Sequence, residues 1–213
     1  MYAPAFNRVE DEEVARQMVA HVGAGELVTV GPDGYPVATL LPVLWSGDRV
    51  RAHLARANPH WRSIAADSPS LLVVTGPQAY VSPSWYASKA EHGRVVPTWN
   101  YTTVHLTGRV RVHDDVDWLR DLVTALTQSH EHGREHPWSV TDAPEAYVEG
   151  QLRGIVGVEI AVERVEAKAK LSQNRSDEDR SGVVEGLRGE ASPDAAVVAD
   201  LMAPDLRSPD LRG

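Results

Sequence analysis

The amino-acid sequence predicts a mainly-β or α+β domain, an antiparallel β-barrel with peripheral helices. Three observations predict it: segments with a strand pattern outnumber those with a helix pattern, short turns join most of them, and regular alternation of strands and helices is absent. Pro32-Asp33-Gly34, between two β-rich runs, is a strong hairpin signal. There is no Gly-x-Gly-x-x-Gly motif, so we do not expect a Rossmann-type nucleotide site.

The first predicted element is a helix over residues 10–22, because Val14, Met18 and Val22 fall on one face. Acidic residues cluster at its start, where the helix dipole favours them. Runs of apolar and β-branched residues then predict strands, and a short helix is expected near Pro59. These strands span residues 27–30, 35–44, 50–54 and 71–75, and the short helix spans residues 59–66.

In the second half of the chain, residues 104–112 alternate between apolar and polar side chains, which predicts a half-buried antiparallel strand. Apolar residues then recur at helical spacing and predict a helix over residues 115–129. A short helix is expected over residues 144–152, and a last strand over residues 155–163.

The composition changes near Gly189, beyond which Pro, Asp, Ala and Ser dominate. The tetrapeptide Pro-Asp-Leu-Arg occurs twice there, at residues 204–207 and 209–212. We expect a folded domain over residues 1–188 and a flexible acidic tail over residues 189–213.

The charge and composition of the chain disfavour or exclude several functional classes. The net charge is −9 and the pI about 5.4, and nucleic-acid binders usually carry a basic face, so direct DNA binding is disfavoured. Cysteine is absent, which excludes disulfides, thiolate metal sites and a cysteine nucleophile. No apolar run approaches the roughly 20 residues of a membrane span and no signal pattern is present, so a cytoplasmic location is expected.

Residues 51–62 are the first segment that favours a ligand site. A strand ends here, and a helix is expected to begin at Asn58-Pro59 with Asn58 as its cap. A helix start offers free backbone N–H groups and a partial positive charge, which suit a phosphate group. Arg56 could add a bidentate clamp, and Asn58 or His60 a further donor. The alternative is a solvated basic face beside a capped helix.

Aromatic residues gather in a second segment, residues 80–101, around an expected long loop. Trp85 and Trp99 belong to it, accompanied by Tyr, Ser, Thr and Asn. A flat ring system needs apolar surface on its faces and hydrogen bonds at its polar edge, and these residue types supply both. The alternative is that the aromatic residues form the core or an oligomer interface.

The third segment, Lys170-Leu-Ser-Gln-Asn-Arg175, carries two cations, a hydroxyl and two amides within six residues. It follows a strand that we expect to be buried, so a ligand or partner explains it better than solvation does. Together the three segments predict a phosphate-bearing aromatic cofactor, for which flavin mononucleotide (FMN) is the leading candidate.

Other chemical motifs are weaker. The histidines at positions 130, 132 and 136 could bind a metal, but Gly133 interrupts the helical spacing, so a polar helix end is the preferred interpretation. There is no Gly-x-Ser-x-Gly motif, and no base stands at a recognisable spacing from Ser82 or Ser84.

Five motifs in this order resemble the PaiB family, described as FMN-binding negative transcriptional regulators within the FMN-binding split-barrel superfamily. They are Met1-Tyr-x-Pro-x-Phe6, His53-Leu-Ala-Arg-Ala-Asn-Pro-His-Trp61, Tyr80-Val-Ser-Pro-Ser-Trp-Tyr86, Val96-Pro-Thr-Trp-Asn-Tyr101 and Lys170-Leu-Ser-Gln-Asn-Arg175. The resemblance covers residues 1–188 and implies a split antiparallel β-barrel. It also implies a homodimer with two equivalent flavin sites at the subunit interface.

The resemblance further implies which residues hold the flavin. The segment after His53 would grip the phosphate, residues 39–42 would line the ring with backbone groups, and residues 170–174 would close the site from the partner subunit. With the segments above, the candidate cofactor-binding residues are Thr39, Leu40, Leu41, Pro42, His53, Arg56, Ala57, Asn58, His60, Trp85, Thr98, Trp99, Lys170, Ser172, Gln173 and Asn174.

The resemblance implies a flavin-dependent sensor that regulates genes, acting through another protein because no DNA-recognition helix is evident. The alternative is an FMN-dependent oxidoreductase, in which the cofactor carries the chemistry and the protein positions an unidentified small molecule. His92, His105 and Tyr86 are candidates for a proton donor, and no catalytic residue is assigned. A third hypothesis is a barrel with an empty pocket whose dimer interface alone matters.

Overall fold

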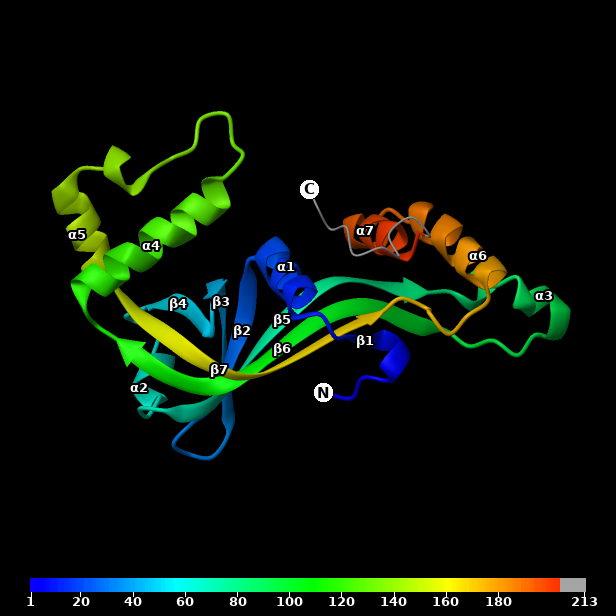
Figure 1. Ribbon diagram of the computed structural model, residues 1–213, viewed down its shortest axis with the longest axis horizontal. Coiled ribbons are helices and arrows are strands. Elements are labelled where there is room, and N and C mark those ends of the chain that lie inside the picture. Colours follow the sequence, from blue (N-terminus) through cyan, green and yellow to red (C-terminus); the bar gives the residue numbers. More distant parts are fainter. Residues whose placement is uncertain (204–213) are drawn as a thin grey trace. The chain divides into compact units, whose positions relative to one another are not determined.

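The computed structural model describes residues 1–203, and in this part of the chain seven strands form one antiparallel sheet (Figure 1). The strand order is β1-β7-β4-β3-β2-β5-β6, and a further pairing between β7 and β6 closes strands β2 to β7 into a barrel. The strands are β1 (Arg8–Val9), β2 (Ala24–Val30), β3 (Pro36–Ser46), β4 (Arg49–Ala55), β5 (Ser68–Val81), β6 (Thr98–His113) and β7 (Ile155–Lys170). The predicted split antiparallel barrel with peripheral helices is confirmed.

The chain divides into two compact units, which we describe separately. The barrel unit comprises Val19–Val74 and His105–Val165. The α6–α7 unit comprises Met1–Met18, Thr75–Val104 and the described residues from Glu166 onward. The short helices are α1 (Glu12–Val22), α2 (His60–Ser63) and α3 (Ser88–His92), and the 3-10 turns are η1 (Ala5–Asn7), η2 (Pro83–Trp85) and η3 (Val140–Asp142).

The barrel core follows the alternation of its strands. In β4, Val50, Ala52 and Leu54 are buried, whereas the side chains between them are half-buried on the opposite face of the strand. The β2–β3 hairpin sets Leu27 opposite Thr39, as the Pro32-Asp33-Gly34 turn signal predicts. This register pairs residues 39–42 of β3 with β2, and the pairing of β3 with β4 runs from Val43 to Ser46.

Two helices of the barrel unit match their predicted ranges within two residues. Helix α4 (Val116–Glu131) begins at Asp115, whose side chain accepts a hydrogen bond from the Trp118 amide at 2.8 Å. Helix α5 (Glu145–Arg153) packs on it through Val148 and Leu152, which share a buried cluster with Leu119. Burial of this apolar stripe stabilises both helices.

The first turn of α4 is fixed to β7 by Trp118. A Cβ atom on Gly157 would lie 2.1 Å from the indole, so only glycine lets the ring approach the strand this closely. The other face of the indole stacks on the His113 imidazole, with a centroid distance of 4.2 Å and an angle of 2° between the rings. The N-terminal end of α4 is therefore held against the barrel.

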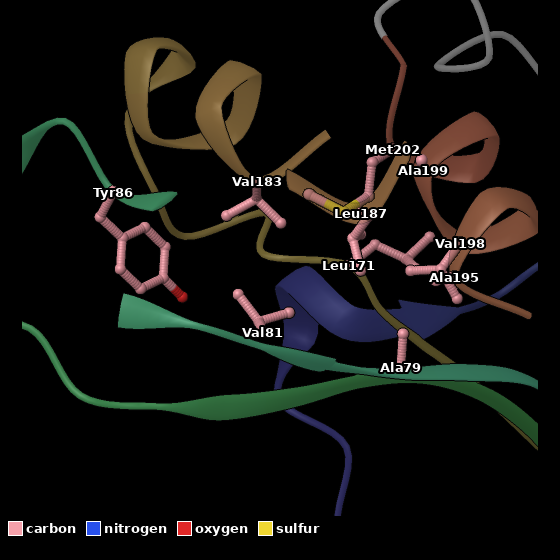
Figure 2. Close-up of a cluster of buried hydrophobic side chains, with 10 residues drawn as sticks. All are labelled: Ala79, Val81, Tyr86, Leu171, Val183, Leu187, Ala195, Val198, Ala199 and Met202. Carbon is pink, nitrogen blue, oxygen red and sulfur yellow. The ribbon is translucent and has the colours of Figure 1, made fainter. Parts of the chain in front are cut away.

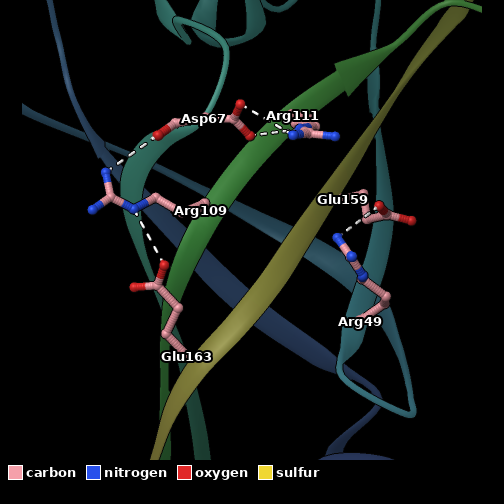
Figure 3. A network of polar contacts seen from close by, with 6 residues as sticks. All are labelled: Arg49, Asp67, Arg109, Arg111, Glu159 and Glu163. Atoms are coloured by element: carbon pink, nitrogen blue, oxygen red, sulfur yellow. Dashed lines mark hydrogen bonds and ion pairs between the residues drawn. The ribbon is translucent and has the colours of Figure 1, made fainter.

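The surface of the barrel unit carries ion pairs that link its strands (Figure 3). Arg49 of β4 lies 3.4 Å from Glu159 of β7, and Arg109 of β6 lies 3.3 Å from Glu163 of β7. Arg111 pairs with Asp67, and this contact holds the pKa of the Asp67 carboxyl below its usual value. Each of these arginines has a carboxylate partner in the barrel unit, so their positive charges are neutralised by the protein itself.

In the α6–α7 unit, helices α6 (Asp177–Arg188) and α7 (Pro193–Met202) form a core with the end of β5 (Figure 2). Val81, Val183, Leu187 and Val198 are fully buried in it. The helix ends also have polar anchors: Arg180 Nη2 donates to the Met202 carbonyl at 2.9 Å. This unit thus has an apolar core of its own.

The predicted flexible tail is wrong for residues 193–202, which form α7. Ala195, Val198, Ala199 and Met202 fall on one helical face and are all buried. Pro193 stands in the first turn of α7, where proline is favoured. The proline that suggested disorder therefore lies at the start of a helix. Residues 204–213, with both copies of Pro-Asp-Leu-Arg, lie outside the described residues.

Candidate functional site

A buried polar cluster in the barrel unit brings together three of the predicted site residues, Thr39, Asn58 and His60. His60 Nδ1 lies 2.8 Å from Thr39 Oγ1, and His60 Nε2 lies 2.9 Å from Thr29 Oγ1. Asn58 Nδ2 donates to Thr39 Oγ1 at 3.4 Å. The cluster joins the start of α2 to β2 and β3.

The surroundings of the His60 ring favour its neutral form. Its side chain is buried between the two threonine hydroxyls, and burial lowers the pKa of the imidazole. A neutral imidazole donates from one nitrogen and accepts at the other, so one threonine hydroxyl donates to the ring and the other accepts from it. His60 therefore holds the two strands together rather than offering a positive charge to a ligand.

Helix α2 is shorter than predicted and begins at His60, one residue after Pro59. The cap position is Pro59 and not Asn58 as predicted, although Asn58 Oδ1 accepts from the His60 amide at 3.0 Å. The neighbouring Ala57 is exposed. The Asn58 side chain thus orders the segment that follows β4.

Arg56 is committed to protein partners. Its Nε donates to the Arg153 carbonyl at 2.8 Å, and its Nη2 donates to the Ile155 carbonyl at 2.9 Å. Both terminal nitrogens also bond the Asp114 carboxylate, and these bonds hold the pKa of Asp114 below its usual value. The guanidinium predicted as a phosphate clamp thus fastens the end of β4 to the start of β7.

A pocket of about 300 Å³ lies between β3, β4 and the C-terminal half of α4. Two predicted site residues line it, Pro42 of β3 and His53 of β4. His53 Nδ1 is buried and has no hydrogen-bond partner within the described part of the chain, and burial lowers the pKa of this imidazole. The remaining wall includes Val123, Leu126, His130 and Trp138.

Residues 39–42 of β3 lie in different surroundings. Leu41 is buried, whereas Leu40 is 68% exposed. Of the four residues predicted to line a ring, Thr39 joins the polar cluster, Leu41 joins the core, and Pro42 reaches the pocket.

The predicted residues of the α6–α7 unit gather where β7 ends. Lys170 Nζ donates to Thr98 Oγ1 and to the Trp99 carbonyl, each at 2.5 Å. Burial lowers the pKa of the Lys170 ammonium, and the neighbouring charges of Lys168 and Arg175 lower it further. The lysine is therefore anchored to β6 and surrounded by like charge.

The turn after Lys170 is bonded internally. Ser172 is buried with φ +60° and exchanges hydrogen bonds with the Asn100 side chain, at 3.0 and 3.2 Å. Gln173 accepts from the Leu171 amide at 2.7 Å and donates to the Ala169 carbonyl at 2.5 Å. Asn174 is exposed. The predicted polar cluster is a well-bonded turn with one side chain open to solvent.

The two tryptophans predicted near the ligand differ. Trp85 packs against α6, where Cβ atoms on Gly182 or Gly186 would collide with it. Trp99 is 47% exposed and donates from Nε1 to Gln78 Oε1 at 3.0 Å. Trp99 thus keeps part of its ring exposed to solvent, whereas Trp85 packs against the core of the α6–α7 unit.

The proton-donor candidates do not gather into a site within either unit. Tyr86 is buried in the core drawn in Figure 2. His92 accepts from the Arg94 amide at 3.0 Å in an exposed turn of the same unit, and His105 lies in β6 of the barrel unit. No group of three His, Asp or Glu side chains among residues 1–203 is arranged to hold a metal ion.

Comparisons with known proteins identify the family of this chain. Residues 1–164 match the family model described as "Putative FMN-binding domain". The chain belongs to this family. It is also 35% identical to "Protease synthase and sporulation protein PAI 2" of Bacillus subtilis over 211 residues, which cover 97% of this chain and 99% of that protein. The resemblance to the PaiB family is confirmed, and the cofactor that this membership implies is FMN, as predicted.

Solved structures show the same fold at low sequence identity. The FAD and heme binding protein from Mycobacterium smegmatis superposes with a TM-score of 0.58 at 18% identity, covering 82% of this chain and 79% of that chain. The flavocytochrome Anf3 from Azotobacter vinelandii gives 0.56 at 15% identity, covering 83% and 75%. Within the part of the chain that the structure describes, no helix is long and apolar enough to cross a membrane.

The wall that α4 contributes to the pocket was not predicted from the sequence. Val123 and Leu126 were assigned only to the apolar face of the helix, and Trp138 to no site. The strand and helix residues that meet in the pocket are about 70 or more positions apart, and no motif spacing connects them. The sequence signal that could have indicated this wall is Trp138, a tryptophan shortly after the polar end of the predicted helix.

Proposed function

We propose that this protein is an FMN-binding regulator whose flavin state controls its interaction with another protein. The observation that carries the proposal is the match of residues 1–164 to the FMN-binding family, in a chain whose barrel unit has a pocket lined by the predicted site residues Pro42 and His53. A planar heteroaromatic cofactor fits this combination.

The segment from Arg56 to His60 is the proposed holder of the phosphate. Asn58 and Arg56 order this segment through their internal hydrogen bonds, and Ala57 and Pro59 are exposed between them. The Arg56 guanidinium carries five N–H groups, of which the internal bonds use four. When bound, FMN would supply reversible electron or hydride transfer, and the protein would supply orientation and exclusion of water.

The proposed assembly is a cytoplasmic homodimer in which residues 170–174 of one subunit close the flavin site of the other. Lys170 and the exposed Asn174 are the side chains available for this role. The relative "Protease synthase and sporulation protein PAI 2" supports a regulatory function. The net charge of −9 supports action through a protein partner rather than through DNA alone.

The visible absorption spectrum of the purified protein tests the proposal, before and after addition of excess FMN and desalting. Bands near ~375 and ~450 nm that survive desalting are expected, because the cofactor brings its own chromophore. A protein that stays colourless would contradict FMN binding. Oxidation of a reduced nicotinamide by the yellow protein would instead favour an oxidoreductase.

A further inference from the structure

We infer that the pocket between β4 and the C-terminal half of α4 binds a small organic ammonium ion, a ligand separate from the flavin. The inference goes beyond the proposed function and does not depend on it. The flavin is expected along residues 39–42 and the segment from Arg56 to His60, whereas the ammonium ion is assigned to the wall that α4 provides. This wall and the strands beside it all belong to the barrel unit.

The lining of the pocket combines apolar surface with negatively polarised groups. Pro42, Val123 and Leu126 supply the apolar surface, and Thr127, His130 and Glu131 supply polar groups. Among residues 1–203, no lysine or arginine lines the pocket, and Glu131 is its only carboxyl group. Such a lining suits a ligand with an apolar body and one positive charge.

Glu131 supplies a full negative charge. Its Oε2 accepts from the Trp138 amide at 3.0 Å, and its Oε1 lies 3.4 Å from Arg134 Nε. A carboxylate has about four acceptor positions, so these two contacts leave room for an ammonium N–H group. The Arg134 side chain is 63% exposed, so water screens its pair with Glu131. An ammonium ion inside the pocket meets the same carboxylate with less screening.

The end of α4 adds a partial negative charge. Thr127, His130 and Glu131 belong to the last turns of this 16-residue helix. The carbonyl groups at a helix C-terminus carry a partial negative charge, which stabilises a cation nearby. The helix end and the Glu131 carboxylate therefore favour the same kind of ligand.

Trp138 lines the same part of the pocket with an aromatic side chain. This side chain is 48% exposed, and the backbone N–H bond to Glu131 keeps the residue beside the carboxylate. The face of an indole attracts cations, most strongly where water is partly excluded. A carboxylate next to an indole thus suits an ammonium group, while Val123 and Leu126 contact its alkyl part.

The size of the pocket restricts the ligand to a compact molecule. Small-molecule sites measure roughly 300–1,000 Å³, and this pocket, at about 300 Å³, stands at the lower end. One ring or a short alkyl chain with a single ammonium group suits this volume. A phosphate group would be repelled by Glu131, so the pocket selects against phosphorylated ligands.

Isothermal titration with three probes of similar shape tests the inference. Cyclohexylethylamine, cyclohexylethanol and cyclohexylpropionate are cationic, neutral and anionic at neutral pH. Each is titrated into the purified protein, with and without saturating FMN. Glu131→Gln removes the charge and keeps an acceptor for the Trp138 amide. Glu135→Gln, at a neighbouring carboxylate that is 92% exposed, is the matched control.

Two further variants test the walls of the pocket. Val123→Trp fills it, and Trp138→Leu keeps apolar surface but removes the indole. Circular dichroism and thermal unfolding of each variant check folding.

We expect the wild type to bind the amine, to bind the alcohol roughly 5-fold more weakly, and to reject the carboxylate. Glu131→Gln should lower amine affinity roughly 5-fold and remove the preference over the alcohol, which is the effect of one partly screened ion pair. Trp138→Leu should lower amine affinity roughly 3-fold. Val123→Trp should abolish binding of both probes, and Glu135→Gln should change neither.

Three results would overturn the inference. Equal wild-type affinity for amine and alcohol would show that the pocket does not select a cation. Unchanged amine binding in folded Glu131→Gln and Val123→Trp would place the amine elsewhere. Loss of amine binding on addition of FMN would assign the pocket to the cofactor and leave the proposed function intact. A protein that binds the amine but not FMN would confirm the ammonium site and contradict only the proposed function.

Discussion

The turn at the end of β7 and the pocket beside β4 both contain predicted site residues, yet they differ in how those residues are bonded. In the turn, Lys170, Ser172 and Gln173 all find partners inside the α6–α7 unit. In the pocket, His53 Nδ1 is buried without one in the described chain. Burying a polar atom without a partner is costly, so the turn is the more completely satisfied of the two.

The largest effect should come from breaking the buried network of the α6–α7 unit. Asn100→Leu removes the bonds from Asn100 to Ser172 Oγ and Met202 Sδ, and leaves the serine hydroxyl buried without a partner. We expect the free energy of unfolding to fall by about 2–3 kcal/mol. Urea denaturation measures this, and Gln78→Ala, which removes only the exposed bond to Trp99, is the control with little effect. If Asn100→Leu were as stable as wild type, the bonding of the turn would not explain its polar residues.

Arg56→Ala should weaken FMN binding by roughly 10-fold or more, because it removes a cation from the proposed phosphate segment. The change also frees the end of β4, since Arg56 bonds Asp114, Arg153 and Ile155. Asp114→Asn separates the two effects, because it weakens the anchor and keeps the cation. Isothermal titration with FMN should show a large loss for Arg56→Ala and a small one for Asp114→Asn. Equal losses in both would make Arg56 a structural anchor only.

Lys170→Ala tests whether the turn contributes to binding despite its internal bonds. Two of the three ammonium N–H groups are used by Thr98 and Trp99, and one remains. We expect FMN affinity to fall roughly 3- to 10-fold with the dimer intact. Light scattering after size-exclusion chromatography reports the dimer, and titration reports the affinity. A less stable variant with unchanged affinity would assign Lys170 to the fold alone.

The smallest predicted effect is a loss of barrel stability on mild acidification. Burial lowers the pKa of His53 and His60 in the folded state, so below about 6.5, the unfolded value, the unfolded chain binds more protons. The contribution of these histidines is complete above that pH and is lost as the pH falls through their folded pKa values. Thermal unfolding at pH 5 and 7.5 should show the lower midpoint at pH 5. His60→Gln, which keeps a donor and an acceptor, should reduce the difference; an unchanged difference would exclude His60 as its source.

The sequence pattern located the elements better than their ends. Strand β6 was predicted from residue 104, yet it begins at Thr98, because Thr98 to Tyr101 pair within the sheet although they lack apolar alternation. Strand β7 likewise continues beyond residue 163, through charged residues. Helix α6 was not predicted, and α7 was taken for disorder, because both are stabilised by packing on each other rather than by strong local patterns.

For the site too, local sequence predicted neighbouring residues better than contacts between residues far apart in the chain. The gathering of Thr39, Asn58 and His60 follows from a strand–helix junction next to a hairpin, which local sequence can reveal. The commitment of Arg56 to Asp114 could not be foreseen, since the partner is 58 positions away. The contribution of α4 to the pocket depends on where that helix crosses the barrel, and this is a property of the tertiary fold.

The anchoring of Trp118 on Gly157 has a mechanical consequence for α4. The indole, the His113 stack and the Asp115 cap all act on the first turn of the helix. The pocket residues that α4 supplies begin only at Val123, near its other end. The far end of the helix has a close contact of its own, since a Cβ atom on Gly23 would lie 2.8 Å from the His130 ring. The wall that α4 gives to the pocket is therefore held at both ends of the helix.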